Sequence, residues 1–410
     1  MTLSSTADSE RVFLSQRVLG AKSSATKEMT RLAGLMRGQG KDIITLSQGE
    51  PDFPTPRHIC EAAKAAIDRN ESRYTEVAGT LALREAVVRK FQRDNGLTYT
   101  PDQIQVGCGA KQLLYNALQA TIDPGDEVVI PTPAWVSYPE MVSLAQGVPV
   151  IVRCGASSGF KITPAQLEDA ITPRSKWLML NSPSNPSGAV YSRAELEALG
   201  EVLLRHPHVW VMSDDIYEKI RYDSEPFATP AAVVPALAER TLTINGVSKA
   251  YAMTGWRVGF GGGPISLIKA MNLIQSQSTS HTSSISQAAA VAALDGPMDF
   301  LPTFIDAFRR RRDLVVQALR AVPGLTCDLP EGAFYTFPSC HGLLGTRDQV
   351  GTLIETDTDL AMYLLRSAGV AIVPGSSFGL PGHFRVSYAA SDAELQEAMT
   401  RITRACKQLC

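Results

Sequence analysis

A lysine and an arginine stand eight residues apart, directly after a run of apolar residues that is typical of a buried strand. The run is Thr241–Ile244, and the segment beyond it reads Gly246-Val-Ser-Lys-Ala-Tyr-Ala-Met-Thr-Gly-Trp-Arg-Val-Gly. A lysine amine among small and apolar side chains loses hydration, which lowers its pKa and favours Schiff-base formation with a carbonyl compound. Lys249 is therefore a candidate nucleophile, and Arg257 is spaced to bind an anion beside it. Taken alone, such a lysine is more often a surface residue in a turn.

A carboxylate and a phenol follow a second apolar run. Asp214 and Tyr217 come after Val209–Met212, and Asp215 lies between them. Because the carboxyl ends of parallel strands meet at one edge of a sheet, we expect this pair to lie near Lys249. An acidic pair after a strand is more often a helix N-cap, and we expect Asp215 to have that role.

A loop rich in proline and serine follows a third run, Trp177–Leu180. It reads Asn181-Ser-Pro-Ser-Asn-Pro-Ser-Gly, and its Asn185 brings an amide to the same predicted edge. By composition alone, such a cluster is an ordinary turn.

A glycine-containing segment after the run Gln103–Val106 is a candidate anion site. It reads Gly107-Cys-Gly-Ala-Lys-Gln and opens a helical pattern, so the free N–H groups of a helix N-terminus would face the ligand. Gln112 stands where the dinucleotide fingerprint requires its third glycine. A phosphate monoester therefore fits this segment better than a dinucleotide.

In their order along the chain, these motifs resemble the class I pyridoxal-phosphate-dependent aminotransferases of fold type I. The resemblance runs from about residue 12 to residue 409 and is closest to bacterial aspartate and aspartate/prephenate aminotransferases. It implies that pyridoxal 5′-phosphate is the cofactor and that Lys249 carries it covalently. Asp214 would pair with the pyridinium nitrogen, while Tyr217 and Asn185 would contact the ring oxygen. Lys249, Asp214 and Tyr217 would be the catalytic residues.

The resemblance also implies the remaining contacts with the cofactor. Trp135, in Pro131-Thr-Pro-Ala-Trp, would stack on the pyridine ring. The phosphate would be held by Gly109, Ala110, Ser248 and Arg257, and by Tyr74 of the partner subunit. Without the resemblance, Trp135 and Tyr74 would be taken as packed aromatic residues.

Three further positions match those that hold the substrate, together with Trp135 and Asn185. Arg385, in His383-Phe-Arg-Val-Ser-Tyr, would bind the α-carboxylate through its planar fork, and the backbone of Gly49 would contact the same group. Lys111 would hold the distal carboxylate of aspartate, with help from the segment Ser24-Ala-Thr26. The ordinary alternatives are a solvated arginine on an edge strand and an exposed lysine at a helix N-terminus.

The elements that must position these residues alternate along the chain. Short apolar runs, including Glu127–Ile130 and Val148–Val152, are separated by helical patterns such as Lys111–Ala120 and Ala194–Arg205. This alternation predicts a mostly parallel sheet with helices on both faces. After about residue 300, a long charged helix is expected at Phe304–Val322. Short strands and a closing helix then follow, at Gly332–Phe337, Val370–Val373, His383–Tyr388 and Ala393–Leu409.

We therefore expect an α/β protein of fold type I. The resemblance implies a large domain with a mostly parallel seven-stranded sheet covered by helices, and a smaller α+β domain. The expected boundaries are 1–48 for an N-terminal arm that is part of the small domain, 49–300 for the large domain and 301–410 for the small C-terminal domain. A chain of 410 residues is long enough for two to three domains of about 150 residues each.

Composition excludes several classes of protein. Lysine and arginine number 39 and aspartate and glutamate 41, so the net charge of −2 lacks the excess of basic residues that nucleic-acid binding needs. The seven cysteines form no C-x-x-C pair and the six histidines no H-E-x-x-H, so we expect no disulfide framework and no metal site. We find no secretory signal and no membrane span, and we expect a cytoplasmic protein.

The expected function is transfer of an amino group between an L-amino acid, of the aspartate or glutamate type, and a 2-oxo acid by a ping-pong mechanism. The expected partners are these two small molecules and a second copy of the chain, in a homodimer with shared active sites. Two alternatives stay open. One is an aromatic or specialised biosynthetic aminotransferase, and the other is a pyridoxal-phosphate lyase or synthase with the same cofactor residues.

Overall fold

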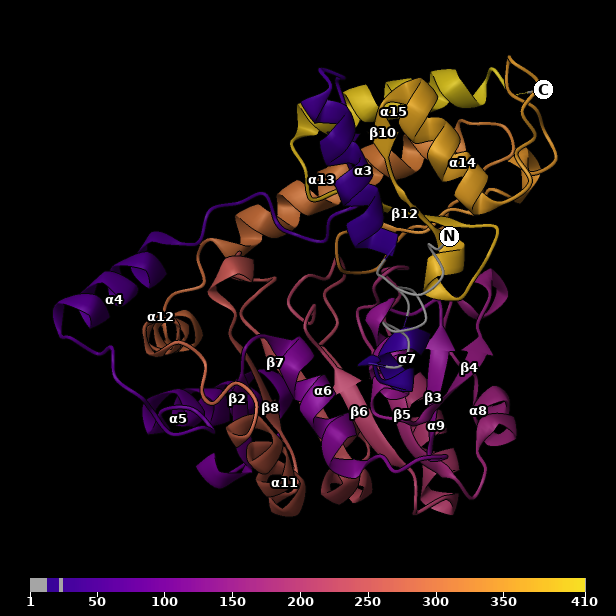
Figure 1. Cartoon of the computed structure of the whole chain (residues 1–410). Coiled ribbons are helices and arrows are strands. Elements are labelled where there is room, and N and C mark those ends of the chain that lie inside the picture. Colours follow the sequence, from indigo (N-terminus) through magenta and orange to yellow (C-terminus); the bar gives the residue numbers. More distant parts are fainter. Residues whose placement is uncertain (1–12, 22–24, 410) are drawn as a thin grey trace, which may run out of the picture.

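A seven-stranded sheet forms the centre of the protein (Figure 1). The structure, a computed structural model, describes residues 13–21 and 25–409. The strands follow the order β2-β8-β7-β6-β5-β3-β4; neighbours from β7 through β4 pair in parallel, whereas β8 is antiparallel to β2 and β7. Their bounds are β2 Ile104–Gly107, β3 Glu127–Thr132, β4 Val148–Arg153, β5 Ser175–Asn181, β6 Trp210–Asp214, β7 Thr241–Gly246 and β8 Gly259–Gly262. The expected mostly parallel seven-stranded sheet is confirmed.

Apolar side chains that point to alternate faces of the central strands explain the helices on both sides of the sheet. On β5, Trp177 and Met179 pack in a core with α6, α7 and α11, while Leu178 and Leu180 pack in a core with α8, α9 and α10. Burial of both faces accounts for the continuous apolar runs in the sequence. The helices are α6 Ala110–Thr121, α7 Ser137–Leu144, α8 Pro164–Ala170, α9 Arg193–Arg205, α10 Pro230–Val233 and α11 Ile265–Ser276.

Three more helices pack beside β2 and form a third core. Leu83 of α5, Ile59 of α4 and Ala289 of α12 are fully buried there. The bounds are α4 Arg57–Asp68, α5 Leu81–Lys90 and α12 Ser284–Asp295, and α5 continues into a π-helical turn at Phe91–Asn95.

The C-terminal elements and the N-terminal helix α3 share one hydrophobic core. Met29 and Ala33 of α3 are buried in it, and β1 pairs in parallel with β10. In Figure 1 this smaller body lies beyond the end of the sheet toward which β6 points. Its elements are α3 Ala25–Gly38, β1 Ile44–Thr45, α13 Leu301–Arg320, β9 Tyr335–Thr336, α14 Asp357–Tyr363, β10 Val370–Ala371, β11 Val373–Pro374, β12 Phe384–Ser387 and α15 Asp392–Cys406; the short helix α2, Gln16–Gly20, lies near α7. The division at residues 48 and 300 stays a prediction.

Strand β8 was missing from the runs identified in the sequence. Three of the four residues of Gly259-Phe-Gly-Gly are glycines, which are poor strand formers, so composition gives little signal for this strand. The structure supplies the reason for the first glycine: a Cβ on Gly259 would meet the backbone nitrogen of Ala110 at the start of α6. In the smaller body, only Tyr335–Thr336 of the predicted strand Gly332–Phe337 is extended. None of the described helices is long and apolar enough to cross a membrane.

Candidate active site

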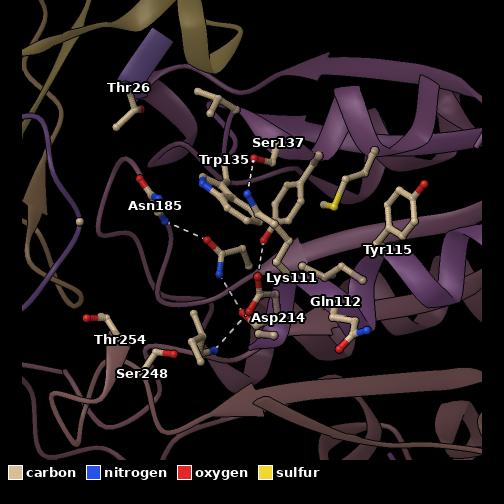
Figure 2. A pocket seen from close by; sticks show the side chains of 18 of the residues that line it. Thr26, Lys111, Gln112, Tyr115, Trp135, Ser137, Asn185, Asp214, Ser248 and Thr254 are labelled. Atoms are coloured by element: carbon tan, nitrogen blue, oxygen red, sulfur yellow. Dashed lines mark hydrogen bonds between the residues drawn. The ribbon is translucent and has the colours of Figure 1, made fainter. Parts of the chain in front are cut away.

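A cavity of about 1190 Å³ opens at the carboxyl ends of the parallel strands, between the sheet and the smaller body. Figure 2 shows how Lys111, Trp135, Asn185, Asp214 and Ser248 lie around it. Most of the residues that the sequence singled out line this cavity: Gly49, Ala110, Lys111, Trp135, Asn185, Asp214, Tyr217, Ser248, Lys249, Arg257 and Arg385. Segments separated by hundreds of residues thus contribute to one pocket.

Lys249 follows β7, and its half-buried side chain places the amine in the cavity. The Nζ atom donates a hydrogen bond of 2.6 Å to the carbonyl oxygen of Gly49. Burial lowers the pKa of Lys249 to about 8; the Glu50 carboxylate opposes this shift, and the positive charges of Arg385 and Arg257 add to it. A larger fraction of this amine is therefore neutral near physiological pH than for an ordinary lysine, and the neutral form is the nucleophile.

Asp214 ends β6 and is buried. One carboxylate oxygen accepts a hydrogen bond of 2.6 Å from the hydroxyl of Tyr138, and the other accepts one of 3.4 Å from the backbone nitrogen of Ile216. Burial raises the pKa of Asp214 to about 6, although the bond from Tyr138 opposes the shift. A carboxylate held in this way can stabilise a positive charge placed in the cavity.

Arg385 lies on β12, with Asn185 and the rings of two aromatic residues around it. Its Nη1 donates to Asn185 Oδ1 at 2.8 Å and its Nη2 donates to the carbonyl of Ser47, while the guanidinium lies 4.6 Å from the centre of the Tyr335 ring. The side chain is only 2% exposed, yet its Nε has no hydrogen-bond partner among the described residues. A buried donor without a partner is costly, so this arginine is arranged for an anionic ligand.

An anion cradle forms where α6 begins. Gly109 caps the helix with φ of 78°, and Arg257, with φ of 57°, places its guanidinium beside it and donates to the carbonyl of Cys108 at 3.2 Å. A Cβ on Gly109 would meet that guanidinium, which explains the glycine at this close approach. The first N–H groups of α6, which starts at Ala110, and the positive charge of Arg257 favour a dianion here.

Lys111 and Trp135 lie close together in the cavity (Figure 2). The Nζ of Lys111 lies 4.5 Å from the centre of the Trp135 ring and donates to Ser137 Oγ at 3.2 Å. Loss of hydration lowers the pKa of Lys111, with Lys27 and Arg257 contributing by repulsion. Thr26 lines the same cavity, whereas Ser24, expected to help Lys111, lies outside the described residues.

The family model of class I and II aminotransferases matches residues 41–402. The chain belongs to this family. It is 59% identical over 377 residues to an aspartate aminotransferase of Rhizobium meliloti strain 1021, with 92% of each chain covered. It is 55% identical over 397 residues to an aspartate/prephenate aminotransferase of Cereibacter sphaeroides, with 97% of this chain and 99% of that relative covered.

Solved structures agree with this membership of the aminotransferase family. An aspartate aminotransferase from Rhizobium meliloti superposes with a TM-score of 0.95 at 56% identity, with 97% of this chain and 99% of that chain covered. The aspartate aminotransferase from Thermus thermophilus with maleate gives a TM-score of 0.89 at 43% identity, with 96% and 99% covered. The resemblance inferred from the motifs and the fold type I architecture are confirmed.

Two of the predicted residues, Gly109 and Tyr74, do not line the cavity of this aminotransferase. Gly109 packs on Arg257 at the rim of the anion cradle. Tyr74 is 94% exposed and touches only the ring of His281 among the described aromatic residues, so it is not a packed aromatic in the single chain. Its expected role in a partner's site stays a prediction.

The capping role expected for Asp215 is wrong. No helix begins after β6; the chain makes turns there, and the buried carboxylate of Asp215 accepts hydrogen bonds from Ser213 Oγ at 2.6 Å and Thr229 Oγ1 at 2.7 Å. A cap needs free helical N–H groups, and none follow this residue.

Two aromatic residues of the aminotransferase site were missed in the sequence. Tyr138, which holds Asp214, comes one turn after Trp135, so the local spacing could have indicated it. The hydroxyl of Tyr335 lies 2.8 Å from that of Tyr217, but Tyr335 comes from the smaller body. No local pattern links two tyrosines from such distant segments.

Proposed function

We propose that the chain is an aspartate aminotransferase that moves the amino group of L-aspartate to a 2-oxo acid by a ping-pong mechanism. One observation carries the proposal: a single cavity contains a half-buried lysine whose amine has a pKa of about 8 and a buried guanidinium whose Nε has no partner among the residues described. The amine suits carbonyl chemistry, and the guanidinium suits a carboxylate. The names of relatives at 55–59% identity support aspartate as the donor.

The residues present fit pyridoxal 5′-phosphate. The cradle formed by Gly109, Ala110 and Arg257 suits a phosphate dianion, and the raised pKa of Asp214 reflects a buried carboxylate suited to a cationic ring nitrogen. Lys249, which lines the same cavity, supplies the amine. When bound, the cofactor would supply an electron sink for the electron pair left at the substrate Cα when its proton is removed.

The protein side chains have separate tasks in the proposed reaction. Arg385 orients the substrate through its α-carboxylate, and Asn185 holds the guanidinium in place. Lys249, once its amine is free, removes the proton from Cα as a general base, for which a pKa near 8 is well matched. Lys111 attracts the distal carboxylate in the part of the cavity where its ammonium lies over the Trp135 ring. This charge distinguishes aspartate from donors with neutral side chains.

We extend the proposal to a homodimer in which Tyr74 of the partner subunit reaches the phosphate. Its support is the exposure of the Tyr74 ring, 94% in the single chain, on a protein in which most aromatic residues are packed. A cytoplasmic location also stays a prediction.

A half-reaction tests the function. Purified holoenzyme is mixed with L-aspartate without any 2-oxo acid, and oxaloacetate is measured. We expect one equivalent per active site, followed by continued turnover only when 2-oxoglutarate is added, because the amino group stays on the enzyme until an acceptor arrives. Continued product release without an acceptor would instead identify a lyase, and a burst with phenylalanine but not aspartate would identify an aromatic aminotransferase.

A further inference from the structure

The turn after β6 directs some of its side chains into the cavity and others away from it. Asp214 and Tyr217, three residues apart, line the cavity. Asp215 and Glu218, also three residues apart, are buried on the other side, where Asp215 is held by hydroxyl groups and Glu218 by a cation. The turn is closed by a bond from the backbone nitrogen of Glu218 to the carbonyl of Asp215 at 2.9 Å. A displacement of Glu218 would therefore also displace Tyr217, because both residues belong to this closed turn.

The cation that holds Glu218 is Lys90, the last residue of α5. Lys90 pairs with Glu218 Oε1 and donates to Asn95 Oδ1 at 2.6 Å, while Asn95 Nδ2 donates to Glu218 Oε2 at 2.7 Å. These side chains are 1%, 6% and 6% exposed. The three groups form a closed, buried triangle of one ion pair and two hydrogen bonds, in which Glu218 Oε1 has the charge of Lys90 beside it but accepts no hydrogen bond from the described residues.

The local backbone is shaped to build this triangle. Residues five apart do not share a face of an α-helix, but Lys90 directly precedes a π-helical turn and Asn95 is its last residue, which brings them together. A second ion pair, Lys219 Nζ to Asp94 Oδ2 at 2.8 Å, joins the same two segments. Inserted π turns are frequent at functional sites. This one contacts the turn after β6 through Glu218, on the side away from the cavity.

The same cluster reaches the segment that carries the reactive lysine. Tyr251, two residues after Lys249, is 2% exposed, and its hydroxyl has no hydrogen-bond partner within the described part of the chain. Burial is the main cause that raises the pKa of this phenol, and the negative charges of Glu218 and Asp94 raise it further. The cluster therefore lies close to both segments that supply catalytic side chains, namely the turn after β6 and the segment that carries Lys249.

Stability does not explain such a cluster, because a buried ion pair is often no better for folding than apolar side chains of the same volume. We propose that Glu218, held by Lys90 and Asn95, is a positioning residue that fixes the Tyr217 hydroxyl and the Asp214 carboxylate relative to the cofactor. The inference rests on the proposed function. Glu218 touches neither substrate nor cofactor and acts through the turn between Asp214 and Tyr217.

The test replaces the ion pair by apolar residues in the double variant Lys90→Met/Glu218→Leu, which leaves no buried charge unpaired but removes both partners of the Asn95 amide. We expect the midpoint of thermal unfolding to fall by only a few degrees, because a single neutral amide is left without partners. We expect kcat with aspartate to fall about tenfold to hundredfold, since small displacements of catalytic groups have effects of this size, with KM changed less than about threefold. Pyridoxal phosphate should bind the apoenzyme about tenfold more weakly, and the pH midpoint of the bound cofactor's absorbance change should shift by about one unit.

Two further variants make the result decisive. Lys90→Met/Glu218→Gln leaves no buried charge unpaired and keeps a bond between position 218 and Asn95, so it gives the same readouts if the first double variant does not fold. Glu127→Gln is the matched control: its carboxylate is 5% exposed and is paired with Arg174 at the opposite end of the sheet. It should lower thermal stability and leave kcat, cofactor affinity and the absorbance midpoint unchanged.

Wild-type values of kcat, cofactor affinity and absorbance midpoint in either double variant would overturn the positioning role. Equal losses in Glu127→Gln would also overturn it, because the effect would then be a general loss of stability. Failure of the proposed function would be distinct, since wild-type enzyme would then release no oxaloacetate from aspartate.

Discussion

Charged residues at the two ends of the parallel strands differ in how fully they are paired with other groups of the protein. At the amino ends, Glu127 accepts hydrogen bonds from Thr172 and Arg174, which lower the pKa of its carboxyl group. At the carboxyl ends, burial raises the pKa of Asp214 to about 6 and lowers that of Lys249 to about 8. Charges at the amino ends are thus matched to partners in the fold, whereas those at the carboxyl ends lack full partners and are prepared for a ligand.

The largest difference between the two ends is expected for the lysines. Lys249→Ala should lower kcat by at least about four orders of magnitude, because it removes both the cofactor attachment and the general base. Lys176, which pairs with Asp126 at 2.8 Å at the amino end, provides the control. Lys176→Ala should leave steady-state turnover with aspartate unchanged. Retention of turnover by Lys249→Ala would refute the assignment of the site.

The arginines give the second comparison. Arg385→Lys should lower kcat/KM for aspartate about a hundredfold, because lysine cannot form the two parallel bonds of a guanidinium with a carboxylate. Arg240 also binds backbone carbonyls, those of His206 and Val209, but at the amino end. Arg240→Lys should lower the unfolding temperature and leave kcat/KM intact. Similar losses of kcat/KM in both variants would mean that Arg385 has only a structural role.

Specificity gives a smaller effect. Lys111→Ala should raise KM for aspartate about tenfold, equivalent to about 1.4 kcal/mol of lost attraction to the distal carboxylate. A monocarboxylic donor such as leucine has no such group, and its KM should change less than about twofold. Steady-state kinetics with both donors measure the ratio; equal changes would show that Lys111 does not recognise the distal carboxylate.

Stability is expected to change in opposite directions at the two ends. In the apoenzyme at pH 7, Asp214→Asn should raise the free energy of unfolding by about 2 kcal/mol, because it removes a buried charge whose pKa in the folded state exceeds that in the unfolded state. The gain should shrink as pH falls below about 6, where the carboxyl group of folded wild type takes up a proton, and vanish near pH 4. Glu127→Gln should lower the free energy of unfolding by about 1 kcal/mol at pH 7, since it removes a bonded carboxylate.

Thermal or denaturant unfolding of both apo variants between pH 4 and pH 8 measures these changes. A loss of stability in Asp214→Asn at pH 7 would contradict the contrast between the two ends. The holoenzyme of Asp214→Asn should lose turnover, although its apo form gains stability. Such a trade-off is expected where function requires a group that destabilises the folded state.

Much of the site was predictable because its signals are local. Lys249, Asp214 and Asn185 each follow an apolar run directly, and the rule that parallel strands end at one edge brings them together. The strand β8 and the role of Asp215 were not predictable in this way. The glycines of β8 give no strand signal, and whether an acidic residue caps a helix depends on whether a helix follows it.

The sequence by itself determined the types of chemistry: an amine after one strand, a carboxylate after another and a glycine turn that opens a helix. It also determined the alternation of strands and helices, because hydrophobic periodicity is a local property. Only the tertiary structure decided which side chains meet across the chain, such as Tyr335 with Tyr217 and Lys90 with Glu218. It also decided the protonation of Lys249 and Asp214. The surrounding segments remove water from these groups, and this loss of hydration shifts their pKa values.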